Sequence, residues 1–138
     1  MYHNSITAKD FYKCGHVFQY IPGTNIVYAN LTARKSRIPT SKEIVVAGLQ
    51  GVIIESFIEK FNSSFFEQDK EKVVTRYKHV IDSTLGPDKI TYDHIAALHD
   101  LGYLPIKIKA LREGTIVPVG IPFVTIVNTK PEFFWVTN

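Results

Sequence analysis

Residues 106–127 read IKIKALREGTIVPVGIPFVTIV, and this stretch decides the fold. Apolar and lysine side chains alternate over its first five residues, as in a strand with one face exposed. A turn follows at Arg112-Glu113-Gly114, and a second turn at Pro118-Val119-Gly120. The β-branched segment that closes the stretch is typical of another strand. The sequence therefore predicts a largely antiparallel sheet here, with strands near 105–111, 115–119 and 122–128.

Towards the N-terminus, the same patterns predict one more strand and three helices. A strand near 26–34 follows the turn Pro22-Gly23. The first helix is expected to start at a capping box, Thr40-Ser41-Lys42-Glu43, and to bury an apolar stripe. Because Gly48 and Gly51 would lie three residues apart on it, we expect another backbone to pack there. The predicted stripe consists of Val46, Leu49, Ile53, Phe57 and Phe61.

The second helix is expected to start at Asp69 and to end at Gly86-Pro87, and the third to end at Gly102. We expect one domain over residues 1–138, of the α+β class, with three helices packed on a mostly antiparallel sheet. Three aromatic residues follow one another at Phe133-Phe134-Trp135 near the C-terminus. Chain ends are usually polar, so we expect these rings to pack on other parts of the protein or on sequence that this chain lacks.

Composition indicates an ordinary globular protein. The chain has 138 residues, is 45% hydrophobic and 21% charged, and carries a formal net charge of +3. It shows neither a leader nor a membrane span, and one cysteine suits a reducing compartment, so we expect a cytoplasmic protein with no membrane contact. The basic segments Arg34-Lys35-Ser36-Arg37 and Lys107, Lys109, Arg112 lack interleaved aromatic residues, so we expect no nucleic-acid partner.

Common catalytic signatures are absent from the sequence, including phosphate-binding loops, serine-hydrolase elbows and zinc-protease motifs. His94 and His99 are spaced to lie on different faces of a helix, so we expect exposed histidines and no metal site. Cys14 stands close to His16, but this spacing in a loop gives no evidence of a catalytic dyad. A small, semi-buried thiol is the simpler reading.

The segment Asp10–Gly23, DFYKCGHVFQYIPG, mixes a carboxylate, aromatic rings, a lysine and a histidine. In the structural reading, its aromatic residues belong to the core or to an interface, and Asp10 caps a helix that starts at Phe11. In the functional reading, Tyr12 offers a flat face for an aromatic ligand, while Lys13, His16 and Arg34 supply positive charge for phosphates. The residues alone leave both readings open.

This segment resembles the Asp-x-Tyr-Lys-x-x-His-x-x-Gln-Tyr-x-Pro signature of the nicotinamide phosphoribosyltransferases. The resemblance continues through Gly48-Leu49-Gln50, Leu104–Ala110, Glu113–Gly120 and Phe123–Thr129 to the closing Trp135-Val136-Thr137-Asn138. The sequence departs from the family at Lys9 and Phe11. Relatives that use nicotinate share Asp-x-Tyr-Lys but usually diverge at the positions of His16 and Gln19-Tyr20-x-Pro22, so the resemblance favours nicotinamide.

The resemblance implies an N-terminal domain of an enzyme that joins nicotinamide to phosphoribosyl pyrophosphate, giving nicotinamide mononucleotide and pyrophosphate. It implies that Tyr12 sandwiches the nicotinamide ring across a homodimer interface, that Asp10 lies near the same pocket, and that Arg34 contacts phosphate. Lys13 and His16 match supporting positions. The domain would lack the catalytic barrel and be inactive alone, and Mg²⁺ would serve the parent enzyme. The alternative is a non-catalytic dimerisation module derived from this family.

Overall fold

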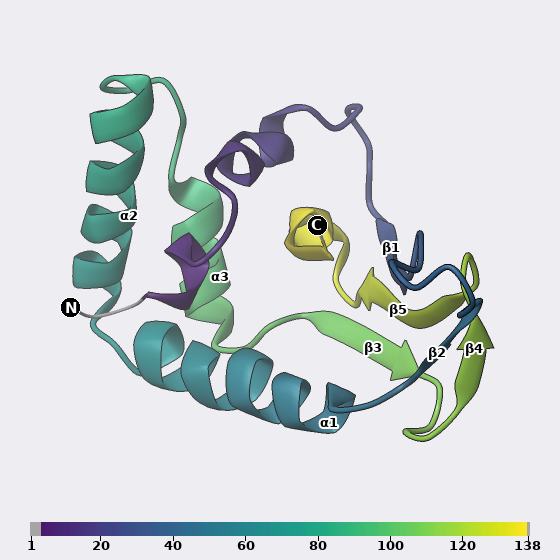
Figure 1. Ribbon diagram of the computed structural model, residues 1–138. Coiled ribbons are helices and arrows are strands. Elements are labelled where there is room, and N and C mark those ends of the chain that lie inside the picture. Colours follow the sequence, from purple (N-terminus) through teal and green to yellow (C-terminus); the bar gives the residue numbers. More distant parts are fainter. Residues whose placement is uncertain (1–3, 138) are drawn as a thin grey trace. The chain divides into compact units, whose positions relative to one another are not determined.

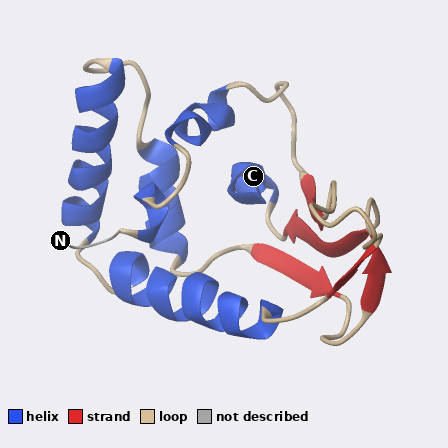
Figure 2. Cartoon of the chain, viewed as in Figure 1, coloured by secondary structure: helices blue, strands red, loops and turns tan. Residues whose placement is uncertain are grey.

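The computed structural model describes residues 4–137, and the chain divides into two compact units (Figure 1). The first unit takes its residues from the stretch that ends at Gly23 and from Ile53–Leu104. The second takes them from Thr24–Val52 and the stretch that begins at Pro105. Of the elements in the described part of the chain, the two long α-helices belong to the first unit and the strands to the second (Figure 2). This segregation confirms the predicted α+β class.

The helices and strands have the following bounds. The helices are η1 (Ser5–Thr7), η2 (Phe11–Phe18), α1 (Leu49–Val52), η3 (Ile53–Glu59), η4 (Asn62–Phe66), α2 (Lys70–Leu85), α3 (Asp93–Leu101) and η5 (Pro131–Thr137). Of these, η1, η2 and η5 are 3-10 helices, and η3 and η4 have π-helical winding. The strands are β1 (Tyr28–Thr32), β2 (Glu43–Val45), β3 (Ile106–Ala110), β4 (Ile116–Pro118) and β5 (Pro122–Asn128).

Helix α2 follows its local sequence signals closely. The Asp69 carboxylate accepts a hydrogen bond from the backbone N–H of Lys72 at 3.0 Å, which satisfies one of the unpaired donors of the first turn. Val73, Tyr77 and Ile81 recur at every fourth position and are buried. The helix ends at Gly86, whose φ of 92° lies outside the helical region. The prediction for this helix is therefore confirmed.

Helix α3 packs beside α2 in the first unit and ends as the sequence indicates (Figure 1). Ile95 and Leu98 are buried on one face of α3. Gly102 adopts the left-handed conformation, with φ at 80°, and its N–H bonds the carbonyl of His99. The predicted end of the third helix is confirmed.

The first predicted helix starts later than its capping-box pattern indicates. Glu43–Val45 forms strand β2, which pairs with β4, and Leu49 is the first residue of α1. The anion at this helix start comes from a distant residue, because the Glu113 carboxylate accepts a hydrogen bond from the backbone N–H of Gln50 at 3.0 Å. Hydrogen bonds from the backbone N–H groups of Gln50 and its neighbours lower the pKa of Glu113. Sheet pairing and this long-range cap override the local pattern.

The helical segment that runs from Leu49 to Phe66 also differs from the prediction in its packing. Among its residues, Phe65 is buried, whereas the expected stripe member Phe57 is exposed. A Cβ added at Gly48 or Gly51 would meet no atom within 4 Å, so the expected close backbone contact is absent there within the described chain. Gly48 instead has φ at 76°, which makes it the residue that turns the chain into α1.

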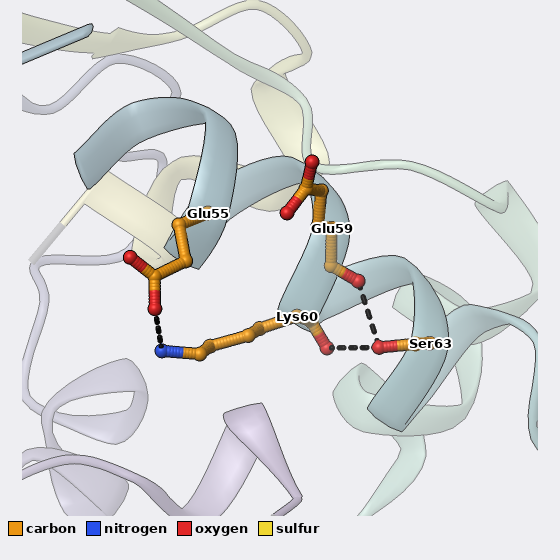
Figure 3. Close-up of polar contacts among 4 residues, drawn as sticks. All are labelled: Glu55, Glu59, Lys60 and Ser63. Carbon is orange, nitrogen blue, oxygen red and sulfur yellow. Dashed lines mark hydrogen bonds and ion pairs between the residues drawn. The ribbon is translucent and has the colours of Figure 1, made fainter. Parts of the chain in front are cut away.

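The solvent side of this segment is held by local polar contacts (Figure 3). The Lys60 ammonium forms an ion pair with the Glu55 carboxylate at 2.5 Å. The Ser63 hydroxyl donates to the Glu59 carbonyl at 2.8 Å and lies 3.4 Å from the Lys60 carbonyl. Each of these contacts joins residues three to five positions apart, so they support the helix without fixing its place in the unit.

The second unit contains two antiparallel sheets. The larger has the strand order β1-β5-β3, with Tyr28 and Lys107 both opposite Val127 of the central strand. The smaller pairs β2 with β4, and Val45 lies opposite Ile116. The four predicted strands are all present and antiparallel, and β2 is the strand that the sequence reading missed.

A buried side chain ties the end of β5 to the segment before β1. The Asn128 side-chain oxygen accepts from the backbone N–H of Val27 at 2.8 Å. Its amide nitrogen donates to the carbonyls of Asn25 and Lys130, at 2.8 and 2.9 Å. The side chain therefore uses its oxygen and its nitrogen in the fold, which a buried amide requires.

The aromatic residues near the C-terminus pack within the described chain. Helix η5 packs against β5, and Phe133 and Trp135 are buried, while Phe134 is half-buried. The expectation that these rings find packing partners is confirmed for Phe133 and Trp135. Asn138 lies outside the described residues. No helix within residues 4–137 is both long enough and apolar enough to cross a membrane.

Candidate functional site

The opening segment forms two short 3-10 helices in the first unit. Asn4 caps η1 by accepting a hydrogen bond from the backbone N–H of Ile6 at 3.1 Å. Helix η2 begins at Phe11, as expected, but the Asp10 side chain makes no capping hydrogen bond. The Asp10 backbone carbonyl accepts from the N–H of Lys13 at 3.0 Å instead. The predicted helix start is therefore confirmed, whereas the predicted side-chain cap is wrong. The Asp10 carboxylate is exposed and is available for another role.

Tyr12 is presented to solvent by η2. Its side chain is 64% exposed, although a tyrosine normally buries much of its ring. Its ring centroid lies 5.2 Å from that of His16, with the planes tilted by 60°. His16 and Lys13 are both half-buried on the same helix. The structure thus brings Asp10, Tyr12, Lys13 and His16 together within one short helix and its first cap.

Below this helix lies a buried group of side chains that the sequence reading did not connect. The Cys14 thiol is buried, and Tyr77 of α2 is completely buried beside it. Burial raises the pKa of Tyr77 above its ordinary range, and Cys14 acts in the same direction. Burial lowers the pKa of Lys9, and Lys13 lowers it further, against an opposing effect of Cys14. Cys14 was predicted to be a small, semi-buried thiol, and the structure buries it more fully.

His94 is part of this group, which corrects the prediction that it is an exposed helix histidine. Its ring lies edge-on to Phe18, with centroids 5.6 Å apart, and edge-on to Tyr77 at 6.2 Å. Burial lowers the pKa of His94 to about 4, with Lys9 acting in the same direction and Asp93 against it. His94 is therefore neutral at physiological pH. Its partners lie far away in the sequence, so no local signal marks it.

His99 also departs from the prediction of an exposed side chain. It is half-buried, its Nε2 lies 2.9 Å from the Gln68 carbonyl, and its ring is edge-on to Phe65 at 5.3 Å. Among residues 4–137, no group of three or more His, Cys, Asp or Glu side chains is arranged to hold a metal ion.

Arg34 belongs to the second unit. It is exposed and follows β1, which ends at Thr32, so it stands at a strand end as predicted. The Ala33 carbonyl accepts a hydrogen bond from the N–H of Gly120 at 2.8 Å, and this bond fixes the backbone immediately before Arg34. A guanidinium on a fixed backbone can make two parallel hydrogen bonds to a phosphate.

The first unit therefore presents an exposed tyrosine on a short helix, and the second unit presents an exposed arginine just after a strand. Residues 4–108 match the model of the family "Nicotinamide phosphoribosyltransferase, N-terminal domain". The chain is 50% identical to a nicotinamide phosphoribosyltransferase of Acinetobacter baylyi over 98% of its own length. It is 27% identical to a nicotinamide phosphoribosyltransferase of Xanthomonas campestris pv. campestris, again over 98% of this chain.

The chain belongs to the family of nicotinamide phosphoribosyltransferase N-terminal domains. It spans 28% of the Acinetobacter protein and 26% of the Xanthomonas protein, so it corresponds to little more than a quarter of these relatives.

Proposed function

We propose that this chain is the N-terminal domain of a nicotinamide phosphoribosyltransferase and supplies part of its substrate site. In the complete enzyme, the ring nitrogen of nicotinamide attacks C1 of the ribose as the bond from C1 to pyrophosphate breaks, giving nicotinamide mononucleotide and pyrophosphate. The observation that carries the proposal is 50% identity across 98% of this chain to a protein of that name.

Within that reaction, Tyr12 stacks on the nicotinamide ring and fixes its plane. Its exposure and its place on η2 support this role, since a ring that receives a ligand must be accessible. His16, whose ring lies against that of Tyr12, and Lys13 act as supporting residues. We assign the exposed Asp10 carboxylate, at the start of η2, to the edge of the nicotinamide site. Orientation of the attacking ring is the contribution of these residues to catalysis.

Arg34 neutralises phosphate charge as pyrophosphate leaves, and its accessible guanidinium supports this assignment. We further propose that the site is shared between the subunits of a cytoplasmic homodimer, and that residues 1–138 act as one domain that is inactive alone. Mg²⁺ accompanies phosphoribosyl pyrophosphate in the parent reaction, and we assign it no ligand in this chain.

The stacking role can be tested in a chimera in which residues 1–138 replace the matching region of the Acinetobacter protein. We expect Tyr12→Ala to raise the KM for nicotinamide about tenfold, which corresponds to a loss of about 1.4 kcal/mol of stacking. Tyr12→Phe keeps the ring and is expected to retain the original KM. The readout is initial-rate formation of nicotinamide mononucleotide.

An unchanged KM in Tyr12→Ala would remove the stacking role. The isolated chain, assayed in parallel, is expected to form no nicotinamide mononucleotide. A chimera that folds but makes no product, at any substrate concentration, would favour the non-catalytic dimerisation module.

A further inference from the structure

Helix η2 needs support from outside itself to hold Tyr12 in one direction. It has eight residues in 3-10 geometry, which is long for a helix type with poor hydrogen-bond geometry. Tyr12 itself is mostly exposed and is therefore held by the helix that carries it more than by burial of its ring. Its direction depends on how the helix is fastened to the rest of the first unit.

Two contacts fasten η2 to the long helices of the same unit. Near its middle, Cys14 is buried against Tyr77 of α2. At its last residue, Phe18 lies edge-on to His94 of α3, with ring centroids 5.6 Å apart and planes at 88°. His94 in turn lies edge-on to Tyr77, with planes at 85°. Edge-to-face pairs of this kind are directional, so they fix orientation as well as distance.

We propose that Phe18 and His94 are positioning residues for Tyr12, because their edge-to-face contact fastens the end of η2 to α3 and so sets the direction of the Tyr12 ring. This inference rests on the proposed role of Tyr12 in stacking on nicotinamide. Phe18 is 50% exposed, which is more than filling the core requires. The contribution of Phe18 to the position of Tyr12 is therefore its edge contact with His94, and not burial of its ring.

The reaction rate of the single cysteine reports how firmly η2 is fastened to the rest of the first unit. Cys14 is the one thiol in the sequence and is the buried residue of η2, so a thiol reagent such as dithionitrobenzoate reacts with it when the helix opens. In the 138-residue chain, we expect Phe18→Ala to accelerate this reaction about tenfold while the unfolding midpoint changes little. Tyr103→Ala removes a comparably exposed ring of the same unit, just after the end of α3, and is the matched control with an expected unchanged rate.

The effect on the site is measured in the chimera described above. Phe18→Ala is expected to raise the KM for nicotinamide about fivefold and to leave kcat within about twofold, because a misdirected ring binds less well. Phe18→Tyr restores the ring edge and is expected to restore the KM, and Tyr103→Ala is expected to leave the KM unchanged. A variant that only loosened the fold would lower the amount of active enzyme and not shift the KM.

The outcomes separate this inference from the proposed function. If Tyr12→Ala raises the KM but Phe18→Ala leaves both the KM and the Cys14 reaction rate unchanged, the positioning role is overturned. If Tyr12→Ala leaves the KM unchanged, the stacking function fails, and with it the role of Phe18 and His94 in presenting Tyr12; the Cys14 rate then reports the fastening of η2 alone.

Discussion

Two buried polar side chains, one in each unit, have opposite surroundings. Asn128 in the second unit makes three hydrogen bonds, to Val27, Asn25 and Lys130. Tyr77 in the first unit is completely buried, and its hydroxyl has no strong hydrogen-bond partner among the described residues, because its polar neighbour Cys14 carries a weakly bonding thiol. The first side chain connects distant backbone segments, whereas the second contributes its ring to an aromatic cluster.

This difference shows which interactions specify the fold of each unit. A buried polar group contributes to stability when its partners are present, and leaving those partners unpaired costs more than the bond itself contributes. The path of the chain in the second unit therefore depends on the polar atoms of Asn128. The first unit depends on the packing of rings around Tyr77. The Tyr77 hydroxyl therefore adds little to stability, and the uncharged state of the neighbouring His94 contributes more.

The largest expected effect is that of Asn128→Ala. It leaves one N–H and two carbonyls without their partner, and three hydrogen bonds at about 1 kcal/mol each predict a loss of about 3 kcal/mol in the free energy of unfolding. Denaturant unfolding followed by fluorescence of Trp135, the single tryptophan, measures this loss. Thr125→Ala on the same strand is the control and is expected to lose less than about 1 kcal/mol. A loss for Asn128→Ala no larger than that of the control would break the comparison.

The next effect is a loss of stability in acid, and it arises in the first unit. The fold holds the pKa of His94 at about 4, below its ordinary 6.5, so the unfolded chain takes up a proton at this site more readily. Stability that is fully present above pH 6.5 is therefore lost as the pH falls towards 4. Between about pH 7 and about pH 5, the expected loss is roughly 2 kcal/mol.

Comparing unfolding at these two pH values in the original protein and in His94→Leu isolates the contribution of His94. Other groups titrate in both proteins, so their effects cancel in the difference. The variant is expected to show a shallower dependence on pH. Equal slopes would mean that His94 accepts a proton in the folded state without penalty, contrary to its burial beside Lys9.

The smallest effect is expected for Tyr77→Phe, which removes the hydroxyl and keeps the ring. Because that hydroxyl has no partner stronger than the Cys14 thiol within the described part of the chain, the free energy of unfolding should change by less than about 0.5 kcal/mol, or rise. Tyr77→Leu, which removes the ring, is the contrasting variant and should lose at least about 1 kcal/mol. A loss above about 1 kcal/mol in Tyr77→Phe would show that the hydroxyl is hydrogen-bonded, for example to a buried water.

Elements with local signals were predictable from the sequence. In α2, all of the signals lie within one segment of the sequence. They are the cap at Asp69, the buried spacing of Val73, Tyr77 and Ile81, and the stop at Gly86. The strands 106–110 and 122–128 are likewise indicated by local sequence, the first by alternation of apolar and lysine residues and the second by β-branched residues. These features depend on backbone geometry over a few residues, which local sequence controls.

Features set by distant partners were not predictable. The capping-box pattern at Thr40–Glu43 fails because β4 pairs with Glu43–Val45 and because Glu113 provides the anion at the helix start. His94 was expected in solvent because neither Phe18 nor Tyr77 is near it in the sequence. The candidate site shows the same division: the residues of η2 could be listed in advance, but not the contacts that hold the helix.

The measurement that tests the account most directly is a double-mutant cycle on the KM for nicotinamide, made in the chimera with Tyr12→Ala, Phe18→Ala and both together. If Phe18 acts through Tyr12, and Tyr12 stacks on nicotinamide, the double variant should have the same KM as Tyr12→Ala alone. Fully multiplicative effects, or a KM that neither single substitution changes, would contradict the account.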